Sequence, residues 1–156
     1  LAATRRNGAS VYVDYAHTPE AIEVALKSLK PHILGKLIVI IGAGGERDEG
    51  KRPLMGLAAE KNSDFVIITD DNPRNEDPQL IHQMIKNGIK DKNKVMVIGD
   101  RAEAILKAVD LLGVGDCLLI AGKGHETEQF IGENIFPFDD FEQASLSVSS
   151  LDGIEQ

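Results

Sequence analysis

The sequence contains one cysteine, no tryptophan and only 4% aromatic residues in a chain of 156 residues. The single cysteine, Cys117, excludes an internal disulfide and a thiolate metal site, so we expect a cytoplasmic protein. So few aromatic rings leave little surface for stacking on nucleic-acid bases, and a net charge of −8 opposes binding to a phosphate backbone. The longest apolar runs have five or six residues, too few to cross a membrane. We therefore expect neither a nucleic acid nor a membrane as a partner.

Short apolar runs recur along the chain at intervals of roughly 20–30 residues, the spacing of a strand followed by a helix. The five runs cover residues 11–13, 37–41, 65–68, 95–98 and 117–121. Most of them are apolar at every position, which is typical of strands covered on both faces of a parallel sheet. With 42% hydrophobic residues, a chain of this length can bury the core of one domain.

Helices are expected between these runs. Their start signals are Thr18-Pro19, Pro53 ahead of Leu54, Leu57 and Ala58, Asp77-Pro78, and Asp100 with Glu103, and a last helix is expected over residues 141–151. Residues 130–131 and 135–136 flank a glycine-containing turn and predict a hairpin. The sequence thus predicts an α/β fold: a Rossmann-like, open, mostly parallel sheet of about six strands, with helices on both faces. One antiparallel edge strand or hairpin is expected near the C-terminus.

The unusual polar residues follow the predicted strands directly. They form four segments, residues 14–19, 42–53, 69–74 and 122–126. Ligands of open α/β sheets bind at the carboxyl ends of the strands, where these four segments would meet. The pattern therefore predicts a ligand site at this edge.

The glycine-rich segment 42–53 is an incomplete match to two known loops. Gly45 to Lys51 fits the start of a phosphate-binding loop, but Arg52 stands where Mg²⁺ binding needs Ser or Thr. Residues 42–44 match the first part of the glycine-rich motif that binds dinucleotides, but Arg47 stands where that motif has its third glycine. A flexible glycine turn is one alternative. We favour a tight loop that aims Arg47 at an anionic group, and the cations at the following helix start suggest a local anion or carboxylate partner.

The tetrad Asp71-Asn72-Pro73-Arg74 is the most informative motif. An arginine can grip a carboxylate with two hydrogen bonds, an aspartate can hold an ammonium group, and an asparagine can both donate and accept. Together they suit a zwitterionic amino acid. The alternative is an Asn-Pro turn that happens to be followed by a surface arginine.

The histidines carry weaker signals. His17 is a candidate polar contact or proton carrier, or simply a hydrogen-bonded residue beside a helix start. His125 and Glu126 are adjacent in sequence and cannot form a helical zinc pair, so no metal site is expected. His32 and His82 are expected at the surface, and Cys117 in the core.

The four polar segments occur in the order found in Mur ligases, and from about Ser10 onward the chain resembles the C-terminal domain of the diaminopimelate-adding type of this family. The matching motifs are residues 14–19, 42–53, 71–74 and 122–126. The resemblance identifies residues 10–156 as that domain and residues 1–9 as a linker from a preceding central domain. A start at Leu1 instead of Met is consistent with a piece of a longer protein.

The resemblance implies a role in cytoplasmic peptidoglycan synthesis. ATP with Mg²⁺ would activate the D-glutamate carboxylate of a UDP-N-acetylmuramoyl dipeptide as an acyl phosphate, and the amine of meso-diaminopimelate would attack it. Arg74 would clamp the distal carboxylate of diaminopimelate and Arg47 would bind a carboxylate. The other implied residues are Asp71, Asn72, Gly122 and Glu126 for the distal amino-acid end, and Asp14 and His17 near the nucleotide.

The family's ATP-binding and uridine-binding domains lie outside this chain, so the resemblance implies binding without catalysis, with no catalytic or metal residue in these 156 residues. Two alternatives stay open. One is a related Mur or folylpolyglutamate ligase domain. The other is a phospho-receiver-like module using Asp70 or Asp71 and Lys123, although strand one supplies only Asp14 where that fold needs an acidic pair.

Overall fold

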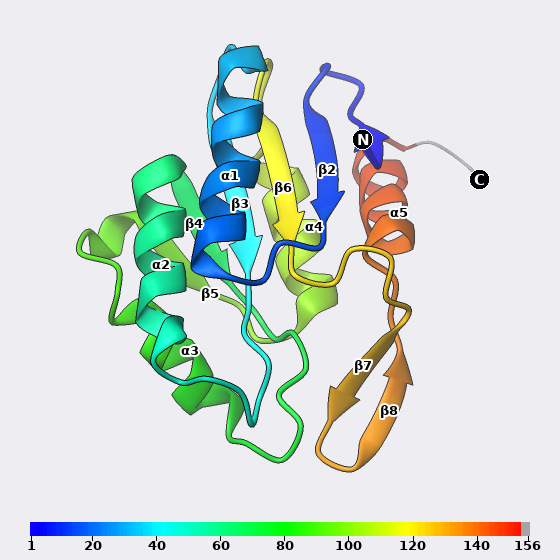
Figure 1. Cartoon of the computed structure of the whole chain (residues 1–156). Coiled ribbons are helices and arrows are strands. Elements are labelled where there is room, and N and C mark those ends of the chain that lie inside the picture. The colour runs from blue at the N-terminus through cyan, green and yellow to red at the C-terminus, as the bar shows by residue number, and fades with distance from the viewer. Residues whose placement is uncertain (154–156) are drawn as a thin grey trace.

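The computed structural model describes residues 1–153, and these form one open six-stranded sheet with helices on both faces (Figure 1). The strands are β1 (Ala3–Thr4), β2 (Ser10–Asp14), β3 (Leu37–Ile41), β4 (Phe65–Ile68), β5 (Val95–Val97) and β6 (Cys117–Ala121). Their spatial order is β1-β2-β6-β3-β4-β5, and all pairs except β1 with β2 are parallel. The predicted mostly parallel α/β sheet is confirmed.

Two apolar layers form because successive residues of each buried strand point to opposite faces of the sheet. The helices are α1 (Pro19–Leu29), α2 (Lys51–Asn62), α3 (Pro78–Lys86), α4 (Arg101–Leu111) and α5 (Asp140–Asp152), with short 3₁₀ helices at Lys30–His32 and Lys92–Lys94. Helices α1, α2 and α3 cover the face that presents Val39, and α4 and α5 cover the face that presents Ile40. Cys117 is buried in the first layer, as predicted. No helix among residues 1–153 is long and apolar enough to span a bilayer.

The predicted helix caps are confirmed at Thr18, Asp77 and Asp100, whose side chains accept backbone hydrogen bonds from the first turns of α1, α3 and α4. Each cap satisfies a backbone N–H group that has no partner within its helix.

Helix α2 presents a different face to the core from the one its leucines suggested. Leu54 and Leu57 are 51% and 40% exposed, whereas Met55, Gly56 and Ala59 are buried. A Cβ atom at Gly56 would lie 2.1 Å from the carbonyl oxygen of Ile85. The small residues therefore face inward because α2 packs closely against α3.

Two further strands pair outside the main sheet. The predicted hairpin is present as β7 (Glu128–Ile131) and β8 (Asn134–Pro137). It extends away from the sheet below β6, beside the loop that follows β4 (Figure 1). Strand β1 was not expected, because it lies in the segment predicted to be a linker. It pairs antiparallel with β2 and forms the antiparallel edge of the sheet.

Candidate ligand-binding site

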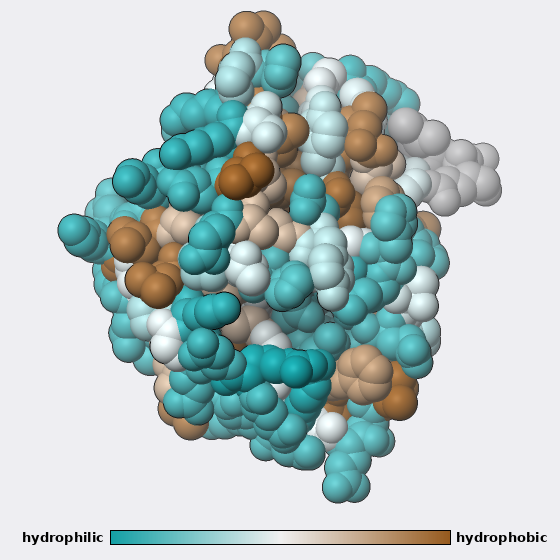
Figure 2. Space-filling view, in the orientation of Figure 1, coloured by the Kyte–Doolittle hydropathy of each residue, from teal (hydrophilic) through white to brown (hydrophobic). Residues whose placement is uncertain are grey.

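A cavity of about 490 Å³ lies at the carboxyl edge of the sheet, where loops after β2, β3, β4 and β6 converge. In Figure 2, hydrophilic side chains gather over these loops, between α2 and the hairpin. The structure brings together most of the predicted site residues: the cavity is lined by His17, Arg47, Asp71, Asn72, Arg74, Gly122 and Glu126. Most of the predicted site residues therefore line one cavity at the carboxyl ends of the strands, where open α/β sheets bind ligands.

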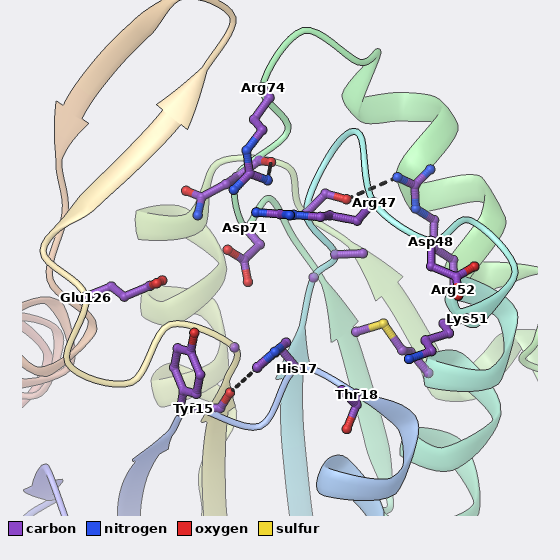
Figure 3. A pocket seen from close by; sticks show the side chains of 16 residues that line it. Tyr15, His17, Thr18, Arg47, Asp48, Lys51, Arg52, Asp71, Arg74 and Glu126 are labelled. Atoms are coloured by element: carbon purple, nitrogen blue, oxygen red, sulfur yellow. Dashed lines mark hydrogen bonds between the residues drawn. The ribbon is translucent and has the colours of Figure 1, made fainter.

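Arg74 is held at the rim of this cavity by its backbone and its side chain (Figure 3). Its φ angle is +55°, and its N–H donates to the carbonyl oxygen of Phe130 at 3.0 Å in β7. Nη1 donates to the carbonyl oxygens of Gly45 (3.1 Å) and Asn72 (3.3 Å). Within residues 1–153, Nε and Nη2 have no hydrogen-bond partner. The Nε and Nη2 groups of Arg74 are thus available to bind an anion.

The glycine loop carries Arg47 on an exposed, tightly turned backbone. The N–H of Gly45 donates to the carbonyl oxygen of Asn72 at 2.7 Å, and a Cβ atom at Gly45 would lie 1.8 Å from the carbonyl oxygen of Pro73. Only glycine permits this approach. The Arg47 side chain extends across the middle of the cavity in Figure 3. These contacts favour a loop whose conformation is fixed by specific contacts over the alternative of a flexible glycine turn.

Asp71 adds negative charge to the cavity lining from the same loop as Arg74. It is 7% exposed, and its carboxylate makes no hydrogen bond within residues 1–153. Gly122 has a φ angle of +118°, and a Cβ atom there would lie 2.6 Å from Oδ2 of Asp71. Gly122 therefore leaves room for a carboxylate that can still accept hydrogen bonds from an ammonium group.

Asn72 performs a structural task as well. Its Oδ1 accepts a hydrogen bond from the backbone N–H of Phe130 at 3.0 Å, which ties the tetrad to β7. The side-chain oxygen of Asn72 is therefore engaged, while its amide nitrogen can face a ligand.

Glu126 lines the cavity from the loop after β6, and Lys123 lies buried in the same loop. The Glu126 side chain is 44% exposed and points toward the cavity in Figure 3. Lys123 is fully buried, lies 3.9 Å from the Glu126 carboxylate, and donates to the carbonyl oxygen of Glu128. Burial lowers the pKa of the Lys123 ammonium group, and the charge of Asp71 opposes that shift.

The two residues expected near the nucleotide are separated. His17 lines the cavity, with Nδ1 2.8 Å from the carbonyl oxygen of Tyr15 and its ring edge-on to the Tyr15 ring. Asp14 accepts a hydrogen bond from the N–H of Ala16 at 2.8 Å and lines a neighbouring groove beside α1.

The expectation that His82 lies at the surface is wrong. His82 is 8% exposed, and its Nε2 lies 2.6 Å from Oδ1 of Asp70, directly before the tetrad. A signal for this burial was present, because position 82 lies beside Ile81 and Ile85 on the apolar face of α3.

Sequence reasoning also missed a buried ion pair under the site. Arg101 donates to Asp140 from Nε (2.8 Å) and Nη2 (2.7 Å), and both side chains are fully buried. Arg101 also donates to the carbonyl oxygens of Asp70 and Ala121, at 3.1 Å each. These carbonyls directly precede Asp71 and Gly122, so the ion pair supports both positions.

Nothing in residues 1–153 forms a group of three potential metal ligands. The glycine loop is not a complete phosphate-binding loop either, because Arg52 replaces the hydroxyl residue and its guanidinium group is bound to Glu76.

Comparison with known proteins identifies the family of this chain. The family described as Mur ligase, glutamate ligase domain, matches residues 2–124. A UDP-N-acetylmuramoyl-L-alanyl-D-glutamate–2,6-diaminopimelate ligase from Bradyrhizobium diazoefficiens is 51% identical over 145 residues, which is 93% of this chain and 29% of the relative. The enzyme of the same name from Coxiella burnetii is 54% identical over 138 residues, 88% of this chain and 28% of the relative.

A solved structure of a ligase of that name superimposes with a TM-score of 0.87 at 43% identity, covering 90% of this chain and 29% of the other. The chain thus spans less than a third of the length of each of these three relatives. Because the family match covers most of the sequence, the phospho-receiver alternative is set aside. This chain belongs to the Mur ligase family.

Proposed function

We propose that this chain is the amino-acid-binding part of an ATP-dependent ligase that joins meso-diaminopimelate to UDP-N-acetylmuramoyl-L-alanyl-D-glutamate. The observation that carries the proposal is the cavity itself, whose lining includes Arg47 and Arg74 from separate loops together with the carboxylates of Asp71 and Glu126. Relatives named for this reaction share about half of their residues with the chain over the matched region. On this proposal, residues 10–156 form the domain, residues 1–9 lead into it, and the enzyme acts in the cytoplasm.

The charges of the cavity complement a ligand with an amino-acid group at each end. Arg74 would bind the distal carboxylate, with Asp71 and Glu126 near the distal ammonium group, and Arg47 would bind another carboxylate. Asn72 and Gly122 would complete the distal subsite. Lysine lacks the distal carboxylate, so its binding would leave the Arg74 guanidinium without its partner. A site built around such a charged hydrogen bond rejects the analogue that lacks it.

The residues present do not fit the phosphates of ATP or Mg²⁺. Residues 1–153 offer neither a metal-ligand cluster nor a complete phosphate-binding loop. ATP would supply the activation of the glutamate carboxylate, and we assign its phosphates and Mg²⁺ to parts of the enzyme outside this chain. Asp14 and His17 would lie on the side that faces the nucleotide. The chain alone is expected to bind the amino acid without catalysing ligation.

The first test is an amide NMR titration of the chain with meso-diaminopimelate and with L-lysine. We expect shifts from diaminopimelate at Arg47, Asn72, Arg74, Gly122 and Glu126. Arg74→Ala should weaken diaminopimelate binding by roughly 10- to 100-fold, the value of a hydrogen bond to a charged group. Arg6→Ala is the matched control, because Arg6 is exposed and precedes the start of β2, at the end of the sheet opposite the cavity. Equal responses to the two ligands would contradict the proposal.

The second test uses steady-state kinetics of the full-length enzyme. Arg74→Ala should raise the KM for diaminopimelate far more than the KM for ATP. Equal increases in both KM values would show that Arg74 does not read the amino acid.

A further inference from the structure

Arg52 is a buried arginine that the proposed function does not use. It is 1% exposed, although it lies in the first turn of α2 at the mouth of the cavity. Its Nη1 and Nη2 atoms both bind the Glu76 carboxylate, with Nη2 2.9 Å from Oε1. Nη2 also donates to the carbonyl oxygen of Gly44 at 3.1 Å, a contact visible in Figure 3. With both ends of its fork engaged, Arg52 is not free to bind a ligand.

Glu76 joins the two loops that carry the site arginines. It lies two residues after Arg74, and its Oε1 accepts a hydrogen bond at 3.0 Å from the backbone N–H of Glu46, the residue before Arg47. The Arg52–Glu76 pair therefore holds the glycine loop at Gly44 and Glu46, and it is anchored in the loop that continues from the tetrad.

The backbone at both ends of this connection is strained. Within residues 1–153, the only non-glycine residues with positive φ angles are Glu46 (+60°) and Arg74 (+55°). Such conformations persist only where surrounding contacts hold them, and they cluster at functional sites. The N–H of Glu46 is held by Glu76, and the N–H of Arg74 is held by Phe130 in the hairpin. Each strained residue thus either precedes a site arginine or is one.

We infer that the Arg52–Glu76 ion pair is a positioning and specificity-determining element, which sets the separation of the Arg47 and Arg74 side chains. A fixed separation selects ligands with two carboxylates at matching spacing over ligands with one. Arg52 and Glu76 act through the two loops and need not touch the ligand. This inference rests on the proposed function, because it assumes that the two arginines bind carboxylates of one amino acid.

The test compares dissociation constants for meso-diaminopimelate and L-lysine by calorimetry in the unsubstituted chain and two variants. Glu76→Gln removes the charge and keeps the shape. Arg52→Met combined with Glu76→Gln removes both charges, which avoids an unpaired buried guanidinium that could unfold the chain. Asp152→Asn is the matched control, since Asp152 pairs with Arg5 (2.7 Å) where α5 ends beside β1, at the opposite end of the sheet.

We expect both variants to weaken diaminopimelate binding by at least about tenfold. The scale is set by the roughly 100-fold loss that a 1 Å misplacement of an interacting group can cause. Lysine binding should change much less, so the preference for diaminopimelate should fall, and the control should keep it. A general loss of stability would weaken the binding of diaminopimelate and of lysine equally, and that result would overturn the inference. In an Arg74→Ala background, Glu76→Gln should change the preference little, because two residues that act through one contact are not additive.

The outcomes separate the two claims. If the unsubstituted chain prefers diaminopimelate and both variants keep that preference, the positioning role is wrong and the proposed function stands. If the unsubstituted chain shows no preference, the proposed function fails and this inference fails with it.

Discussion

Asp140→Asn is the substitution whose effect on stability follows most directly from the structure. Asp140 and Arg101 are both fully buried, and the carboxylate accepts two hydrogen bonds from the guanidinium group. Asparagine keeps the shape but removes the charge. Arg101 would then remain buried as a cation, with only the carbonyl oxygens of Asp70 and Ala121 and one amide oxygen as partners.

The expected loss can be placed on a scale. Breaking a buried ion pair by removing one partner costs about 3–5 kcal/mol, whereas a whole domain is stable by about 5–15 kcal/mol. Because asparagine still accepts one hydrogen bond, we expect about 3 kcal/mol. With a urea m-value of about 2 kcal/mol per molar, this corresponds to a midpoint lower by about 1.5 M.

Urea unfolding followed by circular dichroism measures this difference. Glu23→Gln is the control, because Glu23 pairs with Lys27 at 2.9 Å on the exposed face of α1, where a pair is worth less than about 1 kcal/mol. Replacing Arg101 and Asp140 together with leucine should recover only part of the stability, because no charge is left buried but the carbonyl oxygens of Asp70 and Ala121 lose their donor. A loss below about 1 kcal/mol for Asp140→Asn would refute the reasoning that the pair is a closed, dry contact.

Two further predictions concern titrating groups. The hydrogen bond from Arg52 holds the pKa of Glu76 at about 2, below the ordinary value of 4.5. The ion pair therefore stabilises the fold fully when the pH is above 4.5, and this stabilisation is lost as the pH falls toward 2. The difference in unfolding free energy between the unsubstituted chain and Glu76→Gln should therefore be largest above about pH 5 and shrink in acid, and a difference independent of pH would contradict the assignment. Burial raises the pKa of the Cys117 thiol to about 11, so a disulfide reagent at about pH 8 should react with it only after urea unfolding, and rapid reaction with the folded chain would show that β6 opens.

The fold was predictable because its main signal is local. A strand covered on both faces, such as Leu37–Ile41, must be apolar at every position, and that run stands out in the sequence. Helix caps are equally local, since Asp77 and Asp100 bind N–H groups only two residues away. Strand β1 has no such signal, because two residues held by pairing with β2 carry no periodicity.

The location of the site followed from topology, but its internal supports did not. Once the strands are parallel, residues after β3 and β4 must meet at one edge, and Arg47 and Arg74 do so. The Arg101–Asp140 pair joins residues 39 apart in sequence, and Arg52–Glu76 joins residues 24 apart. No local pattern distinguishes such partners from ordinary surface charges.

A physical reason nevertheless places arginines under this edge. Parallel strands end in carbonyl groups that the ladder leaves without partners, and a buried carbonyl needs a donor. Arg101 provides donors to the carbonyl oxygens of Asp70, just beyond the end of β4, and of Ala121, the last residue of β6. Arg52 provides one to Gly44, beyond the end of β3. Each of these two guanidinium groups is neutralised by its own carboxylate, so neither competes for an anion in the cavity. Among the residues that line the cavity, the positive charge that remains for a ligand is then carried by Arg47, Arg74 and Lys51, which no carboxylate within residues 1–153 neutralises by an ion pair.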